Sequence, residues 1–248
     1  MTVPRNPKLD GAPFWDCIVQ KGPCPMNCNQ CFFNRPGAYY VPLDELPLIP
    51  DPVDVGDDIV RMNCGHDSNI DFDDVVLIAG QYKHVFFNTA IPKLSHFPGP
   101  VVFTANPREE KRPILLAPPP KNLMFIRLRT SGTNLHWIND AIEHYTTLKV
   151  AVVITMMAYY DRLPSIFNKR IANRFGVGDL TTDDCYEWKV RHINSYWCPT
   201  PALIAAVIGR YADNRLVTLC GSRESYYCRD CRNCETRYIQ TLKYMRGE

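Results

Sequence analysis

The residues best suited to chemistry in this sequence are its cysteines, of which there are 11 in 248 residues. Three of them are closely spaced, in the segment Cys24-Pro-Met-Asn-Cys28-Asn-Gln-Cys31. Thiolates are soft ligands that suit iron–sulfur clusters and zinc. Three ligands rather than four leave one metal position open to another molecule, and an open position distinguishes a reactive centre from a structural one.

A second group of cysteines lies near the end of the sequence, at Cys220, Cys228, Cys231 and Cys234. The last three are spaced as in ferredoxins, and Cys220 can supply a fourth thiol. Cys198 is an alternative to Cys220 as that fourth ligand. Four thiolates also satisfy tetrahedral zinc, so zinc competes with an iron–sulfur cluster for this group. The remaining cysteines are interpreted as ordinary buried thiols, namely Cys17, Cys64 and Cys185.

Length, composition and charge limit the class of protein. The chain has 46% hydrophobic residues, enough for one large domain, or for a domain with a small appendage. Its formal net charge of +2 gives no general attraction to nucleic acid or membrane. No stretch approaches the roughly 20 apolar residues that cross a bilayer, and the first residues lack the apolar core of a signal peptide. We therefore expect a cytoplasmic protein, in which clustered cysteines bind metals more often than they form disulfides.

Short apolar runs recur along the first two thirds of the sequence, at residues 14–20, 59–63, 84–87, 101–105, 123–128 and 150–156. Such runs indicate the buried strands of a parallel sheet with crossovers on its faces. Residues 136–147 fit one crossover helix. The segment 41–57 contains prolines at 42, 47, 50 and 52, so we expect an extended loop there.

The sequence after residue 160 has a different pattern, in which we expect a helix at 200–212 and a strand at 215–219. The predicted fold class is therefore α/β, with a partial (βα)6 TIM-like barrel in residues 1–160. A small cysteine-rich C-terminal extension with a metal motif is predicted in residues 161–248.

The first cysteine group resembles the signature of the radical S-adenosylmethionine (radical SAM) superfamily. Cys24, Cys28 and Cys31 have its x3 and x2 spacing, and they follow an expected first strand, as in that family. One position departs from the pattern, because Gln30 stands where the family usually has an aromatic residue. A zinc knuckle or a disulfide-forming loop are the alternatives, although the next histidine is as distant as His66.

The resemblance also implies positions that bind the cosubstrate at the ends of the strands. Gly65 and Asp67 would meet the methionine amino group, although Gly-His-Asp is also a plausible turn. Arg127 or Arg129 would bind the methionine carboxylate, unless both face solvent. The further candidates are Thr104 and Asn106 for ribose or carboxylate, Thr130 and Ser131 as hydrogen-bonding groups, and residues 155–157 near the adenine.

By resemblance, the protein would cleave S-adenosylmethionine reductively at a [4Fe–4S] cluster, and the resulting 5′-deoxyadenosyl radical would abstract hydrogen from a substrate. An electron donor such as flavodoxin or ferredoxin is implied, and so is a second [4Fe–4S] cluster at the C-terminal cysteines. Aromatic residues after the sixth strand are candidates for the substrate pocket, namely Tyr159, Tyr160, His192, Tyr196 and Trp197.

Arginines and tyrosines interleaved in the last residues favour a nucleotide or nucleic-acid base as substrate, unless they form a solvated surface beside a metal knuckle. They are Arg223, Tyr226, Tyr227, Arg229, Arg232, Arg237 and Tyr238. A peptide or amino-acid-like substrate is the alternative within the family. A zinc-binding adaptor for nucleic acid or protein is the alternative from another class. We expect a monomer or a homodimer.

Overall fold

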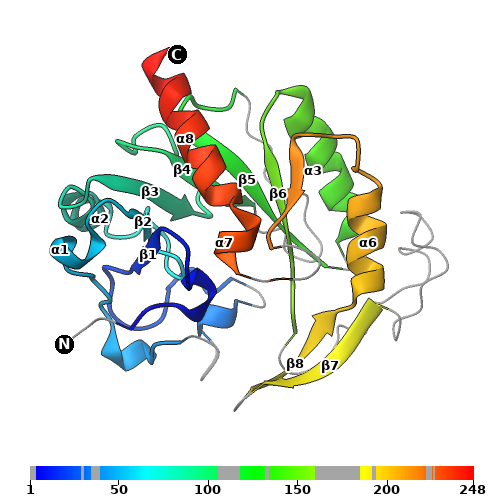
Figure 1. Ribbon diagram of the computed structural model, residues 1–248, viewed down its shortest axis with the longest axis horizontal. Coiled ribbons are helices and arrows are strands. Elements are labelled where there is room, and N and C mark those ends of the chain that lie inside the picture. The colour runs from blue at the N-terminus through cyan, green and yellow to red at the C-terminus, as the bar shows by residue number, and fades with distance from the viewer. Residues whose placement is uncertain are drawn as a thin grey trace.

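The computed structural model of the chain describes residues 4–28, 31–34, 40–105, 118–131, 134–159, 185–191, 194–221, 225 and 227–248. Its centre is a seven-stranded parallel sheet in the order β1-β2-β3-β4-β5-β6-β9, in which β1 to β6 pair in sequence order and β6 then pairs with β9 (Figure 1). The α/β architecture expected from the sequence is confirmed. The sheet is open in the described part of the chain, with β1 and β9 at its edges, and a closed barrel is not formed there.

All six expected strands are present, at β1 (Phe14–Cys17), β2 (Ile59–Met62), β3 (His84–Thr89), β4 (Val101–Ala105), β5 (Leu123–Thr130) and β6 (Val152–Met156). They are formed by apolar and β-branched side chains that are buried on both faces, as in parallel sheets covered on two sides. The seventh strand, β9 (Val217–Leu219), pairs with β6. This strand lies in the segment that the sequence analysis assigned to the C-terminal extension, yet it extends the main sheet.

Helices cover one face of the sheet, which we call the α3 face. They are α2 (Phe72–Ala79), α3 (Leu135–Thr147) and α6 (Pro201–Gly209), and their apolar residues share one core with alternate residues of the strands. α3 and α6 lie close to the expected helices at 136–147 and 200–212. Within residues 41–57, expected to be an extended loop, the structure has two short helices, η3 (Leu43–Glu45) and α1 (Pro52–Val55). The second begins at a proline because the first helical position needs no backbone donor.

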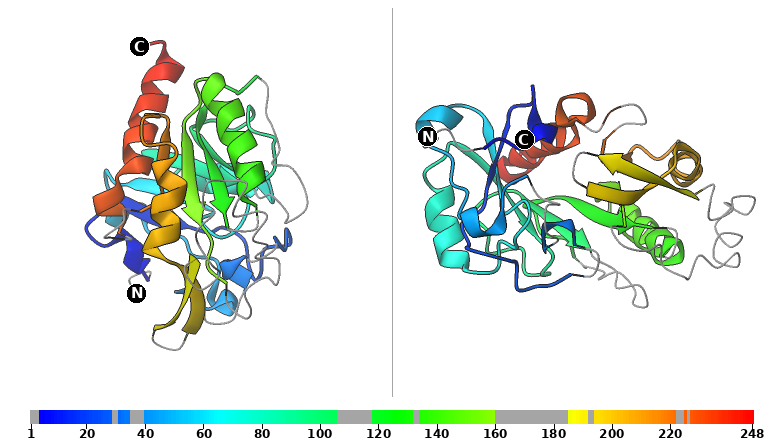
Figure 2. Two further views of the ribbon diagram at one scale, coloured as in Figure 1. Left: turned by 90° about the vertical axis from the view of Figure 1, so that its right-hand side faces the viewer. Right: turned by 90° about the horizontal axis from the view of Figure 1, so that it is seen from below.

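The opposite face of the sheet is covered by the C-terminal helix α8 (Asn233–Arg246), and we call it the α8 face (Figure 2). α8 packs against β5, and Tyr238 inserts among the strand residues. The short helix α7 (Cys228–Cys231) precedes it and lies beside η1 (Pro7–Leu9). Two segments that are far apart in the sequence, η1 and α7, therefore lie side by side on this face.

Two further strands, β7 (Tyr186–Arg191) and β8 (Asn194–Pro199), form a separate antiparallel sheet. It is joined to the end of β6 by a bridge between Tyr159 and Trp197. The remaining short element, η2 (Phe32–Asn34), belongs to the cysteine-containing segment described below. None of the helices found in the described ranges has the length and apolar character needed to cross a membrane.

Candidate functional site

On the α8 face, the side chains change from apolar to polar along each strand from β1 to β6. Each strand from β1 to β6 places an apolar residue of this face in the core under α8, namely Phe14, Ile59, Phe86, Val102, Phe125 and Val153. Two residues further along, on the same face, the side chain is polar in each of these strands. These residues are Asp16, Arg61, Asn88, Thr104, Arg127 and Thr155, and we call them the polar layer. Because all the strands run in parallel, the polar layer lies toward their carboxyl ends, where α/β proteins bind ligands.

The first cysteine group lies beyond this edge of the sheet, in the segment that follows β1. Its turn is closed by side chain and backbone together. The side-chain amide of Asn34 accepts a hydrogen bond from the backbone N of Cys24 at 3.1 Å and donates one to its carbonyl oxygen at 3.1 Å. The backbone N of Cys31 donates to the carbonyl of Cys28 at 3.1 Å. The segment is thus a compact turn that holds Cys24 and Cys31 near each other.

Phe33 fixes this cysteine segment on the turn that follows β2. Its side chain is fully buried, and its ring lies edge-on to His66 with the ring centroids 5.4 Å apart. Gly65 allows this approach, because a Cβ at that position would lie 2.4 Å from Phe33 Cδ2. His66 adds a contact from Nε2 to the carbonyl oxygen of Gly22 at 3.1 Å. The close approach that the sequence analysis assigned to Gly65 is therefore made with Phe33.

The three thiols of the first group are close enough to influence one another. Burial raises the pKa of Cys24 to about 11, and the negative charges of Asp67, Cys28 and Cys31 add to the increase. Arg129 on β5 is the cation beside them. Burial lowers the pKa of Arg129, while the charges of Cys31 and Cys28 act in the opposite direction. Of the two arginines considered for the cosubstrate carboxylate, Arg129 is the one beside the first cysteine group.

Asp67 is buried and holds the neighbouring strand ends together. Its carboxylate accepts hydrogen bonds from Thr89 Oγ1 at 2.7 Å, from the backbone N of Ala90 at 2.7 Å and from the backbone N of Asn69 at 2.9 Å. Such bonds to a buried carboxylate fix the turn after β2 relative to β3. The structure therefore gives Asp67 a clear structural role next to Cys24.

Arg127 lies apart from the first group, in the polar layer. Its Nη1 donates to Asn88 Oδ1 at 3.1 Å and approaches Thr104 Oγ1 at 3.4 Å. Thr104 thus lies where the sequence analysis expected a polar strand end, but its partner is a protein side chain. Asn106 lies outside the described residues.

The second cysteine group gathers at the end of β9. The backbone N of Cys220, the residue after β9, donates to the carbonyl of Ile154 at 2.7 Å. The carbonyl of Leu219 accepts from Asn233 Nδ2 at 2.7 Å and lies 3.8 Å from Cys231 Sγ. Cys198 instead lies on β8, in the separate sheet. The structure therefore brings Cys220, rather than Cys198, to the other C-terminal cysteines.

Cys228 and Cys234 reach back over the α8 face, where they pack against the core under α8. Burial raises the pKa of Cys234 to about 12, although the charges of Arg127 and Arg61 favour the thiolate. The charges of Cys220 and Cys228 act on the same group. The C-terminal thiols are therefore gathered beside two cations of the polar layer.

Arg61 is the main functional candidate that the sequence analysis did not identify. It is 8% exposed and forms a buried ion pair with Asp16, with Nε and Nη2 at 2.8 and 2.7 Å from the same carboxylate oxygen. Its Nη1 points to Cys228 Sγ at 3.9 Å. The signal in the sequence is an arginine within the apolar run Ile-Val-Arg-Met, since a lone charge in a buried strand needs a partner.

Cys64, interpreted above as an ordinary buried thiol, also lies in this environment. Burial raises its pKa to about 11, and the charges of Arg61, Asp16, Arg127 and Cys228 act on it. It is the second residue after β2, so it lies between the first and second cysteine groups in the sequence and near the second in space. Cys17 and Cys185, by contrast, belong to the core of the α3 face.

Across the described ranges, no three His, Cys, Asp or Glu side chains converge at distances that would hold a metal ion. The donor chemistry nevertheless fits a metal at both cysteine groups, because each brings several thiols, the soft ligands of zinc and of iron–sulfur clusters, close to one another and beside an arginine. Binding would turn the thiols toward a common centre, since metal sites form together with the bound ion.

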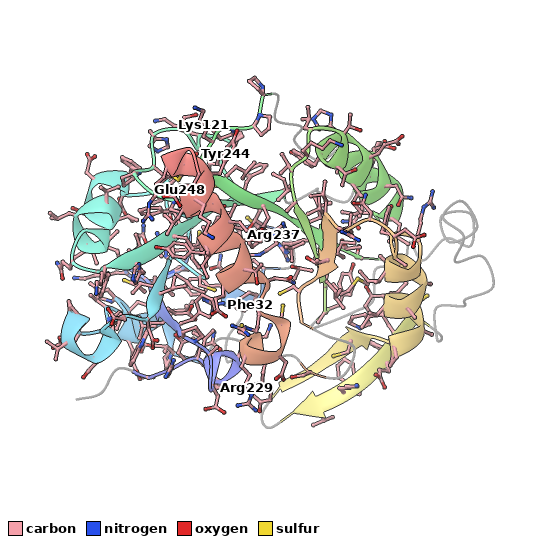
Figure 3. The ribbon with its side chains drawn as sticks, turned by 45° about the horizontal axis from the view of Figure 1, so that its top comes forward. Phe32, Lys121, Arg229, Arg237, Tyr244 and Glu248 are labelled. Atoms are coloured by element: carbon pink, nitrogen blue, oxygen red, sulfur yellow. The ribbon has the colours of Figure 1, made fainter. Side chains whose placement is uncertain are left out.

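The arginines of the C-terminal segment are engaged within the chain. Arg229 on α7 binds Asp10 at 2.8 Å and lies over the ring of Tyr227, and Arg232 binds Glu235 at 3.0 Å. Arg237 on α8 donates to Gln240 at 3.0 Å (Figure 3). These contacts are at the surface, and Tyr238 is in the core under α8.

Two of the aromatic residues considered for a substrate pocket, Tyr159 and Trp197, form the bridge that joins β8 to the end of β6. Tyr196 is on β8. The other candidates, Tyr160 and His192, lie outside the described residues, as do Arg223 and Tyr226. No family model, curated protein or solved structure matches this chain.

Proposed function

We propose that the chain is a radical SAM enzyme with one iron–sulfur cluster at each cysteine group. The observation that carries this proposal is the position of Cys24, Cys28 and Cys31 beyond the carboxyl end of β1, with Arg129 of β5 beside them. A three-thiol group with an adjacent cation suits an anionic cluster and the carboxylate of a ligand bound to it. When bound, the first cluster supplies the electron that cleaves S-adenosylmethionine.

In this proposal, each of these residues of the chain has a separate role. Cys24, Cys28 and Cys31 hold the first cluster, and Arg129 orients the methionine carboxylate. Phe33, packed on Gly65, keeps the cysteine segment in place and excludes water from its inner side. The second cluster would be held by the thiols at Cys220, Cys228, Cys231 and Cys234. A nucleotide or nucleic-acid base remains the substrate class predicted from the sequence.

Anaerobic purification followed by iron analysis tests the proposal. The full chain should bind about four irons per group and absorb broadly near 400 nm, and with S-adenosylmethionine and dithionite it should release 5′-deoxyadenosine. Cys28→Ser should abolish that release and lower the iron content by about one cluster. Cys198→Ser, on the separate β7–β8 sheet, is the matched control and should leave both measurements unchanged.

Arg129→Gln gives a second measurement at the same site. It should weaken S-adenosylmethionine binding about tenfold to a hundredfold, since a charge-assisted hydrogen bond contributes about 1.5–3 kcal/mol. Arg129→Lys should recover part of the loss, because it keeps the charge without the planar fork. A colourless protein that contains only zinc would overturn the enzyme proposal and favour the adaptor.

A further inference from the structure

The environment of Cys228 differs from that of an exposed zinc knuckle. Arg61 reaches it from the middle of the sheet, with its Nη1 at 3.9 Å from the sulfur. The guanidinium is buried, and its other nitrogens are bound to Asp16 at 2.7 and 2.8 Å. Asn6 Nδ2 donates to the second oxygen of Asp16 at 2.8 Å, so the carboxylate is also fixed. The arginine is therefore held with one N–H directed at a cysteine sulfur.

A buried ion pair is costly to form, and stability alone does not explain it. Desolvation of two charges offsets most of their attraction, and apolar residues of similar size are often as stable. An arginine guanidinium stays protonated at all ordinary pH values. The cation is thus permanently present beside the second cysteine group.

The second group also lies close to the strand that reaches the first group. Arg129 is beside Cys28 and Cys31, whereas Arg127, two residues earlier on the same strand, is beside Cys234 and Cys64. Two residues of a strand span about 7 Å. Both cysteine groups therefore lie beside β5, and the second group is close to the main sheet.

We propose that the C-terminal cysteine group is a redox-active iron–sulfur centre whose reduction potential is set by Arg61, held in place by Asp16. Reduction adds one electron to the cluster and makes or breaks no bond. A fixed cation with an N–H directed at a ligand sulfur stabilises the added negative charge, and such contacts set the potentials of iron–sulfur clusters. Arg61 is thus a positioning and tuning residue. This inference rests on the second cluster of the proposed function and not on cleavage of S-adenosylmethionine.

The test is a redox titration of the second cluster, followed by electron paramagnetic resonance, with dithionite as the electron source. The full chain would carry Cys24→Ala, Cys28→Ala and Cys31→Ala, so that only the second cluster contributes. If this chain does not fold, the titration is made with all cysteines present and two midpoints are resolved. No S-adenosylmethionine is added, so failure of the cleavage reaction leaves this measurement intact.

Arg61→Gln should leave about four irons at the second group and shift its midpoint to more negative values. Because this substitution leaves Asp16 as an unpaired buried charge, the double variant Asp16→Asn/Arg61→Gln is measured alongside it. The double variant should shift the midpoint in the same direction, because the cation that is removed is the nearer of the two charges. Arg61→Lys should give a smaller shift.

Arg229→Gln is the matched control, since Arg229 is adjacent to Cys228 in sequence but is directed to Asp10 at the surface. Its midpoint should equal that of the parent chain. An unchanged midpoint in both Arg61→Gln and the double variant would overturn the inference. A second group that takes up zinc and no iron would overturn it as well.

Discussion

At the scale of single residues, the cysteine segment depends on one close contact between Gly65 and Phe33. Gly65 has a φ of +156°, and a Cβ there would lie 2.4 Å from the buried ring of Phe33. That distance is far below a normal contact, and the ring is enclosed by the packing of the cysteine segment. Adding one methyl group at Gly65 should therefore disturb the packing of this segment.

We expect Gly65→Ala to lower the free energy of unfolding by about 1–3 kcal/mol, the usual cost of overpacking. Urea denaturation of the metal-free chain measures it. Gly209→Ala is the control, because a methyl group added at that glycine would project into open space and should change stability little. An equal stability for Gly65→Ala and the parent chain would contradict the packing described.

His66 makes the stability of the same region depend on pH. Its Nε2 faces the carbonyl of Gly22 and so carries the proton, while Nδ1 is buried without a hydrogen-bond partner among the described residues. Burial lowers the pKa of His66 below its usual value of 6.5. The contribution to stability is therefore fully present above about pH 6.5 and is lost as the pH falls through the lower, folded-state pKa.

Urea denaturation between about pH 5 and 8 should show this loss on the acid side. His66→Gln keeps an amide donor for Gly22 but does not titrate, so the acid-side loss should be smaller in that variant. A parallel decline in both proteins would assign the pH dependence to other groups.

At the scale of elements, α8 is the part that covers the apolar half of the α8 face. Tyr238 is 5% exposed and lies against Phe86 and His84, with ring centroids 6.4 and 6.3 Å apart. Helix α8 is mostly polar in sequence, although Ile239, Tyr244 and Met245 are exposed, and the residues that face the sheet from it are few.

Tyr238→Ala should lower the free energy of unfolding by about 3 kcal/mol, because it removes a large buried ring and leaves a cavity. Thermal or urea denaturation measures the change. Tyr244→Ala on the same helix is the matched control, since Tyr244 is 62% exposed (Figure 3), and it should have little effect. Similar losses for the two variants would mean that α8 does not pack through Tyr238.

At the scale of the whole molecule, the second cysteine group lies where segments far apart in the sequence come together. Cys228 lies in α7 beside η1, and Nη1 of Arg61 on β2 lies 3.9 Å from the Cys228 sulfur. A metal bound there would link α7, β9 and the polar layer. Because a metal that binds only the folded chain stabilises it by mass action, its removal should loosen this junction.

We expect the metal-loaded chain to melt at a higher temperature than the chain prepared without metal, in scans made under anaerobic conditions. Cys231→Ser should reduce that difference, and Cys198→Ser should not. Equal melting temperatures with and without metal would show that neither group binds a metal that contributes to stability.

Much of the fold was predictable because it depends on local pattern. Apolar runs at regular spacing located the strands from β1 to β6, and the amphipathic segment after β5 located α3. The short helices within 41–57 were missed, since helices of three or four residues that begin at or directly after a proline resemble extended loops in sequence. The position of β9 in the main sheet was also missed, because strand pairing across a long insertion is set by tertiary contacts.

For the site, the sequence predicted which side chains could take part but not which groups they contact. Cysteine spacing identified both groups, whereas the partner of each arginine depended on which groups share a face. Arg127 and Arg129 were equivalent in the sequence, yet one lies beside the C-terminal thiols and the other beside the first group. Arg61 and Asp16 lie 45 residues apart in the sequence and are brought together by adjacent strands. Their pairing could therefore not be predicted from the sequence.

The sequence by itself determined the grouping and spacing of the thiols and the parallel strands, since these depend on side-chain type and on short-range periodicity. Only the tertiary structure decided that Asp67 ties two strand ends together, that Phe33 fills the space beside Gly65 and that Arg61 faces Cys228. The physical reason is that hydrogen bonds and charges act over a few ångströms in space, and the strands that bring these groups together come from distant parts of the chain.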